Sequence, residues 1–231
     1  TLPSNINMFI GYDQSVFVDE SIYEVRFALL ISILMVIGVI YYFLASPAAT
    51  FIPAITIPVS LISTFYVIYA LGYSLNVLTF LALVLAIGLI VDDSIVVLEN
   101  IKRRIENGEK AFEASIEGAK QITFVVIATT LVLVAVFLPL SFMGGKTGRL
   151  FIEFGVVLSF AVIFSSIVAL TLTPMLCSKL IKNKEKIDEE PMLIRKFRKF
   201  YRESLLESQK NPKRVYLFSV MMIVISVLLF Q

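Results

Sequence analysis

The chain has 231 residues, of which 58% are hydrophobic and 16% are charged, with a net charge of +2. Average soluble domains carry about 25% charged residues, and a soluble fold of this length has too little interior to hide so much apolar surface. A single cysteine excludes an internal disulfide, and the lack of histidine removes the commonest general base and metal ligand. We therefore expect a membrane protein without a metal site.

Six apolar segments follow a polar, irregular stretch over residues 1–24, which is compatible with a short strand leading into a helix. The segments cover residues 27–45, 51–71, 77–98, 122–143, 150–176 and 215–231. About 20 helical residues cross a hydrocarbon core of roughly 30 Å. The first five segments are long enough, and the last lies at the lower limit. The pattern predicts an all-α membrane protein, a bundle of six transmembrane helices.

The basic residues predict the orientation of these helices. Seventeen of the twenty Lys and Arg residues lie in two connections, between the third and fourth segments and between the fifth and sixth. The other three, Arg26, Lys146 and Arg149, lie on the opposite side if the six segments alternate across the bilayer. Because cytoplasmic loops are enriched in Lys and Arg, both long basic loops are expected in the cytoplasm.

Residues 192–208 predict an amphipathic helix in the second basic loop. Ile194, Phe197, Tyr201 and Leu205 recur at helical spacing, and basic side chains occupy most of the remaining surface. This pattern favours a cytoplasmic helix lying in the interface against anionic lipid, and the alternative is a solvated cytoplasmic helix. A nucleic-acid surface is not expected, because the membrane topology already accounts for the basic residues.

Two adjacent carboxylates, Asp92 and Asp93, lie well inside the third apolar segment. Each costs roughly 2.5–3.5 kcal/mol at the centre of a membrane helix, so such a pair must face protein or water. Neighbours on a helix point about 100° apart, so the two side chains cannot share one narrow contact. A carboxylate balanced between burial and a nearby cation can take up a proton and release it. We expect these residues to carry protons; the alternative is a static polar contact between helices.

Other residues near the pair extend this hypothesis. Gly88 lies one turn before Asp92, where a missing side chain permits close packing of another helix. Thr79 falls on the Asp93 face, and Glu99 and Asn100 lie towards the cytoplasmic end. These three are accessory polar candidates. Glu99 and Asn100 fit a proton exit and equally a simple interfacial role.

An intramembrane aspartyl protease is a further alternative for an acidic pair. Its two carboxylates must lie close enough to share a proton across a substrate. Such dyads come from different elements, and none of the other apolar segments contains an Asp. The sequence therefore disfavours this enzyme class, and we predict no catalytic residues.

Residues 86–100, AIGLIVDDSIVVLEN, resemble the fourth transmembrane helix of resistance–nodulation–division (RND) transporters, especially the hydrophobe/amphiphile efflux branch. Further similar motifs follow the same order. They are ATFIPAITIP at 49–58, GYSLN at 72–76, GGKTG at 144–148 and LTPMLC at 172–177. The likeness covers nearly the whole chain and is weakest over residues 182–231.

The resemblance implies a fragment covering family helices two to seven. Residues 1–25 would end a periplasmic porter region, 26–181 would form helices two to six, 182–212 the cytoplasmic connection, and 213–231 the start of helix seven. In the family, the counterparts of Asp92 and Asp93 carry the transported proton. Their cationic and hydroxyl partners belong to helices of the second half, which this chain lacks.

The resemblance also implies the setting of the whole protein. It would be a homotrimeric drug/proton antiporter of the bacterial inner membrane, with protons as coupling ion and no cofactor. Its partners would be a periplasmic adaptor, an outer-membrane channel, the lipid bilayer and amphiphilic small-molecule substrates. The alternative within the superfamily is a member that exports proteins or lipids rather than drugs.

Overall fold

The computed structural model describes residues 14–181 and 192–229, which fall into two units divided between residues 186 and 187. The first unit contains five long helices and a 3₁₀ helix. They are α1 (Gln14–Leu44), α2 (Pro47–Ala70), α3 (Val77–Glu106), α4 (Ala111–Phe137), η1 (Leu138–Phe142) and α5 (Gly145–Leu180). The second unit contains α6 (Met192–Lys210) and α7 (Pro212–Leu229). The described residues contain no strand, which confirms the predicted all-α class.

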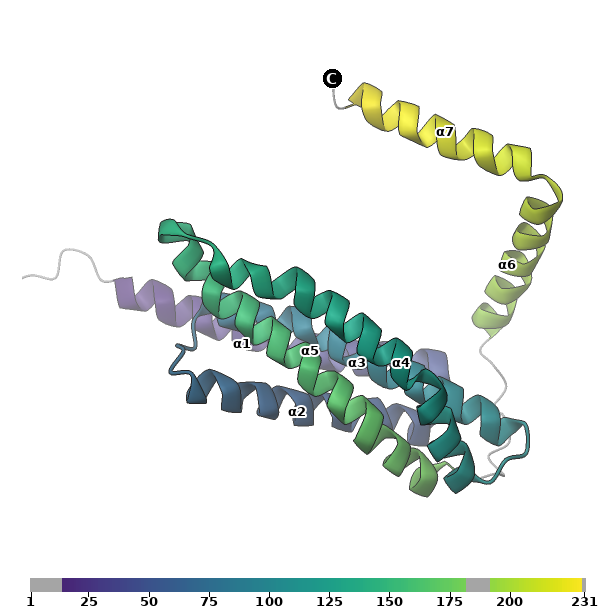
Figure 1. The fold of residues 1–231 in the computed structure, drawn as a ribbon, viewed down its shortest axis with the longest axis horizontal. Coiled ribbons are helices and arrows are strands. Elements are labelled where there is room, and N and C mark those ends of the chain that lie inside the picture. Colours follow the sequence, from purple (N-terminus) through teal and green to yellow (C-terminus); the bar gives the residue numbers. More distant parts are fainter. Residues whose placement is uncertain (1–13, 182–191, 230–231) are drawn as a thin grey trace, which may run out of the picture. The chain divides into compact units, whose positions relative to one another are not determined.

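The first unit is a helical bundle in which α3 contacts α1, α2, α4 and α5 (Figure 1). In the most apolar part of α2, α3 and α5, 44–56% of the residues are buried, against 6% in α1 and 11% in α4. Helices α2, α3 and α5 therefore form the packed centre. Helices α1 and α4 bury few of their apolar side chains, which leaves surfaces suited to lipid or to further protein.

Five helices of the described chain are long and apolar enough to span a membrane, namely α1, α2, α3, α4 together with η1, and α5. A sixth is counted only if parts of α6 and α7, bent by 97°, are taken as one span. The five long spans predicted from the sequence are confirmed. The sixth predicted segment corresponds to α7, whose 18 residues end at Leu229.

The helices extend further than the apolar segments that predicted them. Helix α1 begins at Gln14 rather than near Phe27, so the polar residues from 14 onwards are helical. A strand in residues 1–13 lies outside the described residues. Helix α4 likewise begins at Ala111, eleven residues before its apolar segment. Hydropathy marks the part of a helix that matches the bilayer, whereas backbone hydrogen bonding continues into polar turns.

Two core clusters hold the bundle together. The first joins α2, α3 and α5 through fully buried side chains such as Ile57, Leu83 and Leu158. The second joins the C-terminal end of α3 to α4 and α5, with Leu98, Ile101 and Val126 among its members. Together the two clusters bury two sides of α3 along its length. The packing of the neighbouring helices therefore determines which side of α3 stays uncovered.

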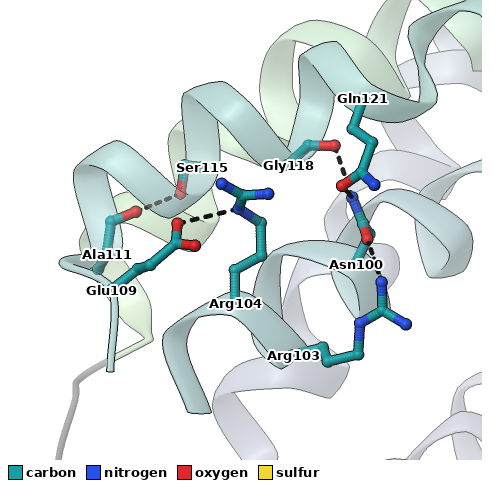
Figure 2. A network of polar contacts seen from close by, with 8 residues as sticks. All are labelled: Asn100, Arg103, Arg104, Glu109, Ala111, Ser115, Gly118 and Gln121. Atoms are coloured by element: carbon teal, nitrogen blue, oxygen red, sulfur yellow. Dashed lines mark hydrogen bonds and ion pairs between the residues drawn. The ribbon is translucent and has the colours of Figure 1, made fainter. Parts of the chain in front are cut away.

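The C-terminal half of α3 approaches α4 closely at Gly118 (Figure 2). A Cβ atom added to Gly118 would lie 2.9 Å from Ile101 Cγ1 and 3.2 Å from Ile101 Cα. Beside this contact, Asn100 Nδ2 donates to the Gly118 carbonyl at 2.8 Å and to Gln121 Oε1 at 3.3 Å. Small residues and interhelical hydrogen bonds are the usual means of joining membrane helices. This contact therefore fixes α4 against α3.

Helix α6 carries the predicted amphipathic segment in the second unit. Its described side chains are exposed, with Phe197, Tyr201 and Leu205 at helical spacing among Lys196, Arg198, Lys199 and Arg202. Among these, Lys199 pairs with Glu203 at 4.0 Å, four residues along the same helix. The amphipathic helix is confirmed, while its place at a membrane interface stays a prediction.

The close approach at Gly118 predicts a stability effect. Gly118→Ala places a methyl group against the Ile101 backbone, which cannot move aside as a flexible side chain would, and should destabilise the protein by about 1–3 kcal/mol. Gly38→Ala is the matched control, since nothing lies within 4 Å of its added Cβ. Thermal unfolding of the detergent-solubilised protein measures both. Equal melting temperatures for the two variants would contradict the packing described for α3 and α4.

Candidate functional site

Helix α3 begins with a well-formed N-cap. The Asn76 side chain accepts hydrogen bonds from the backbone N–H groups of Leu78 (2.9 Å) and Thr79 (3.0 Å). In return, the Thr79 hydroxyl accepts from the Asn76 N–H at 2.8 Å, which completes a capping box. From this start the helix runs for 30 residues to Glu106 without an internal proline. Asp92 and Asp93 therefore sit near the middle of a continuous helix.

One side of α3 is not covered by the other helices of the first unit, and we refer to it as the open face. Its exposed residues follow one another at steps of three and four. They are Val77, Leu81, Leu85, Gly88, Asp92, Val96, Glu99, Arg103 and Glu106. Such steps trace a single stripe along a helix. The open face is apolar up to Gly88 and carries charges from Asp92 onwards.

The two aspartates take different positions relative to this face. Asp92 lies on it and is exposed, whereas Asp93 is half-buried at its edge. The different exposure follows from the angle of about 100° between neighbouring residues. Among the residues that the structure describes, neither carboxylate makes a hydrogen bond or an ion pair. Asp92 therefore stays accessible on the open face, and Asp93 is partly accessible beside it.

Behind Asp93, buried hydroxyl groups join three helices. Ser94 Oγ donates to Thr56 Oγ1 of α2 at 3.0 Å, and Thr56 Oγ1 donates to the Pro53 carbonyl at 2.9 Å. Ser165 Oγ of α5 donates to the Ile90 carbonyl of α3 at 3.0 Å. Ser94, Thr56 and Ser165 are at most 1% exposed. These bonds fix α2, α3 and α5 against one another at the level of the aspartates.

Sequence reasoning missed these hydroxyls, because Ser and Thr are common in membrane helices and also bond to their own backbone. The available signal is positional: Thr56, Ser60 and Thr64 recur every four residues along α2, which predicts one polar stripe on that helix. All three are fully buried. The polar stripe of α2 thus faces the interior of the bundle.

The accessory candidates lie in three different environments. Thr79 is fully buried and engaged in the N-cap, about 20 Å from the aspartates along the helix. Glu99 is exposed on the open face, where it lines a groove of about 350 Å³ with Val96 and Arg103. Asn100 is buried and bonded to α4. The structure therefore brings Glu99 onto the same face as Asp92 and leaves Thr79 at the far end of the helix.

Gly88 and Asn100 contact their surroundings differently. An added Cβ at Gly88 would find nothing within 4 Å, so no other helix of the first unit packs against it. Asn100 instead joins α4, and its Oδ1 accepts from Arg103 at 3.2 Å (Figure 2). The close approach between helices that was expected at Gly88 is found within the chain at Gly118. A helix that packs on Gly88 would have to come from outside the first unit.

No three His, Cys, Asp or Glu side chains gather closely enough to hold a metal ion within the described ranges. The candidate site consists of Asp92 on the open face and Asp93 at its edge, on a helix that buried hydroxyls bond to α2 and α5. Such an arrangement can bind and release protons, provided that a cation or water approaches the open face.

The AcrB/AcrD/AcrF family model matches residues 1–231. The chain is 49% identical over 182 residues to "Multidrug resistance protein MdtC" of Escherichia coli O139:H28 and of Pectobacterium atrosepticum. It is 50% identical over 184 residues to the MdtC protein of Cronobacter sakazakii. These matches cover 79–80% of this chain but 18% of each relative, so the chain spans less than a fifth of their length. They do not favour the aspartyl protease alternative. The chain is a multi-pass membrane protein that belongs to the AcrB/AcrD/AcrF family, and its resemblance to RND multidrug efflux transporters is confirmed.

Proposed function

We propose that this chain forms part of a proton-driven efflux transporter and that Asp92 and Asp93 carry the protons. The observation that carries the proposal is the exposed Asp92 midway along the open face of an apolar membrane helix. Bare contact of this carboxylate with lipid would cost several kcal/mol. The open face is therefore expected to meet protein or water once the rest of the transporter is in place.

The residues support an exchange between two charge states. When protonated, the carboxyl groups are neutral and tolerate an apolar neighbour; when ionised, they need a cation or water beside them. Taking up a proton on one side of the membrane and releasing it on the other is driven by about 2.3 kcal/mol per charge per 100 mV. The cation and hydroxyl partners are proposed to come from helices outside this chain, as the RND resemblance implies.

Three further residues have proposed roles around this exchange. Gly88 lies one turn from Asp92 on the open face and would admit a closely packed partner helix. Glu99 lies two turns beyond Asp92 on the same face, where it would exchange protons with the cytoplasm. Asn100 supports this end of α3 through its bonds to α4 rather than by binding protons.

The setting of the whole transporter follows the resemblance. Relatives are named multidrug resistance proteins, and we propose amphiphilic small molecules as substrates. We also propose a homotrimer in the bacterial inner membrane, working with a periplasmic adaptor and an outer-membrane channel. Residues 1–25 would belong to the periplasmic porter region and 26–181 to family helices two to six. Residues 182–212 would form the cytoplasmic connection and 213–231 the start of helix seven.

The proton-carrying role predicts the effect of neutralising the pair. Asp92→Asn and Asp93→Asn keep the shape of the side chain but cannot gain and lose a proton, so each should abolish dye efflux from cells while the transporter remains in the membrane. Glu113→Gln is the matched control, because Glu113 is exposed in the first turn of α4. Undiminished efflux in both Asp variants would exclude the proposed role.

The proposed orientation predicts which loops are accessible from outside the cell. Asn107 lies in the turn between α3 and α4, and Gly144 lies directly before α5; both residues are exposed. Each is replaced by cysteine in a separate variant, Asn107→Cys or Gly144→Cys. The native Cys177 is fully buried and should give little background. A membrane-impermeant maleimide should label Gly144→Cys with the inner membrane intact and Asn107→Cys only after permeabilisation. The opposite pattern would invert the topology and place the basic loops outside.

A further inference from the structure

A glutamate of α5 lies against the capped N-terminal end of α3. We propose that Glu153 is a positioning residue for the proton-carrying helix, because its carboxylate ties the cap residue Asn76 and the preceding Ser74 to α5. The inference rests on the proposed role of Asp92 and Asp93. It assigns to Glu153 no proton transfer of its own.

Hydrogen bonds between these residues connect the start of α3 to α5. Asn76 and Glu153 are 77 residues apart in the sequence. Asn76 Nδ2 donates to Glu153 Oε2. Ser74 Oγ donates to the same carboxylate, at 3.2 Å from Oε2 and 3.4 Å from Oε1. Asn76 Nδ2 also donates to Ser74 Oγ at 3.0 Å. We refer to Ser74, Asn76 and Glu153 as the α3–α5 latch.

Every polar group of the Asn76 side chain is used in this arrangement. Its oxygen accepts the N–H groups of Leu78 and Thr79, and its amide nitrogen donates to Ser74 and Glu153. A primary amide offers two donor hydrogens and one acceptor oxygen, so none is left for water. The residue that starts α3 is consequently held in one orientation relative to α5.

The charge of Glu153 suits its position. The N-terminus of a helix carries a partial positive charge, and acidic residues in the first turn usually complement it. Helix α3 has no acidic residue in its first turn. Glu153 supplies an acidic side chain from the neighbouring helix instead, and its carboxyl oxygens accept hydrogen bonds from Asn76 and Ser74.

The latch acts on the aspartates through the rigidity of α3. No proline interrupts the helix between Asn76 and Asp92, a distance of about 24 Å along the axis. A second polar contact to the same neighbour, Ser165 Oγ to the Ile90 carbonyl, lies beside the aspartates. Two polar contacts to α5 at different heights set the rotation of α3 about its axis. This rotation decides how Asp92 and Asp93 face their partners.

The proposal is tested in the whole transporter that contains this chain, by exchanging the amide of Asn76 and the carboxylate of Glu153 between the two helices. Asn76→Asp still caps α3, because Asp is as good an N-cap as Asn, but it sets two carboxylates against each other. We expect efflux per folded transporter to fall roughly fivefold or more. Adding Glu153→Gln should restore it to within about twofold of the wild type, because the amide introduced on α5 can donate to the carboxylate introduced at the cap of α3.

The measurement is dye efflux divided by the amount of folded transporter, determined by size-exclusion chromatography. Asn107→Asp, at the exposed C-cap of α3, is the matched control and should transport normally. A double variant as slow as Asn76→Asp would overturn the latch. So would a wild-type rate per folded molecule in Asn76→Asp, since the contact would then serve folding alone. Asp92→Asn and Asp93→Asn run in parallel: normal efflux in both would refute the proton-carrying role, whereas their inactivity beside a fully active Asn76→Asp would refute only the latch.

Discussion

An ionised carboxylate in hydrocarbon is costly, and this constraint governs the arrangement around α3. The helix is buried on two sides by α2, α4 and α5, yet the stripe that contains Asp92 is left open. The chain spans 18% of the length of its relatives. Under the proposed function, the open face is the surface that meets protein or water in the transporter.

Polar contacts hold α3 at three levels. Glu153 binds the N-terminal cap, Ser94 and Ser165 bond at the level of the aspartates, and Asn100 bonds to α4 near the other end. Apolar side chains pack almost as well against lipid as against each other, so hydrophobic burial alone orients a membrane helix weakly. Directional hydrogen bonds fix its rotation. A helix that presents charged groups to a partner depends on that rotation more than a purely apolar helix does.

The sequence analysis singled out some of the residues in these contacts and not others. Asn100 was expected near a proton exit or an interface, and the structure shows it bonded to α4 beside Gly118. Thr79 shares a helix face with Asp93 by its spacing, yet its hydroxyl completes the cap far from the aspartates. Glu153 was not considered, because a single acid near the end of an apolar segment is common. Side-chain partners distant in sequence leave no local pattern.

The sequence by itself determined the membrane class, the five long spans and the position of the acidic pair, because hydrophobic length and charge are local properties of the chain. The divergence of Asp92 and Asp93 also followed from helix geometry alone. Only the tertiary structure decided which side of α3 stays open, which hydroxyls join α2, α3 and α5, and where polar turns extend the helices. These features depend on contacts between distant residues, and such contacts exist only once the helices have packed.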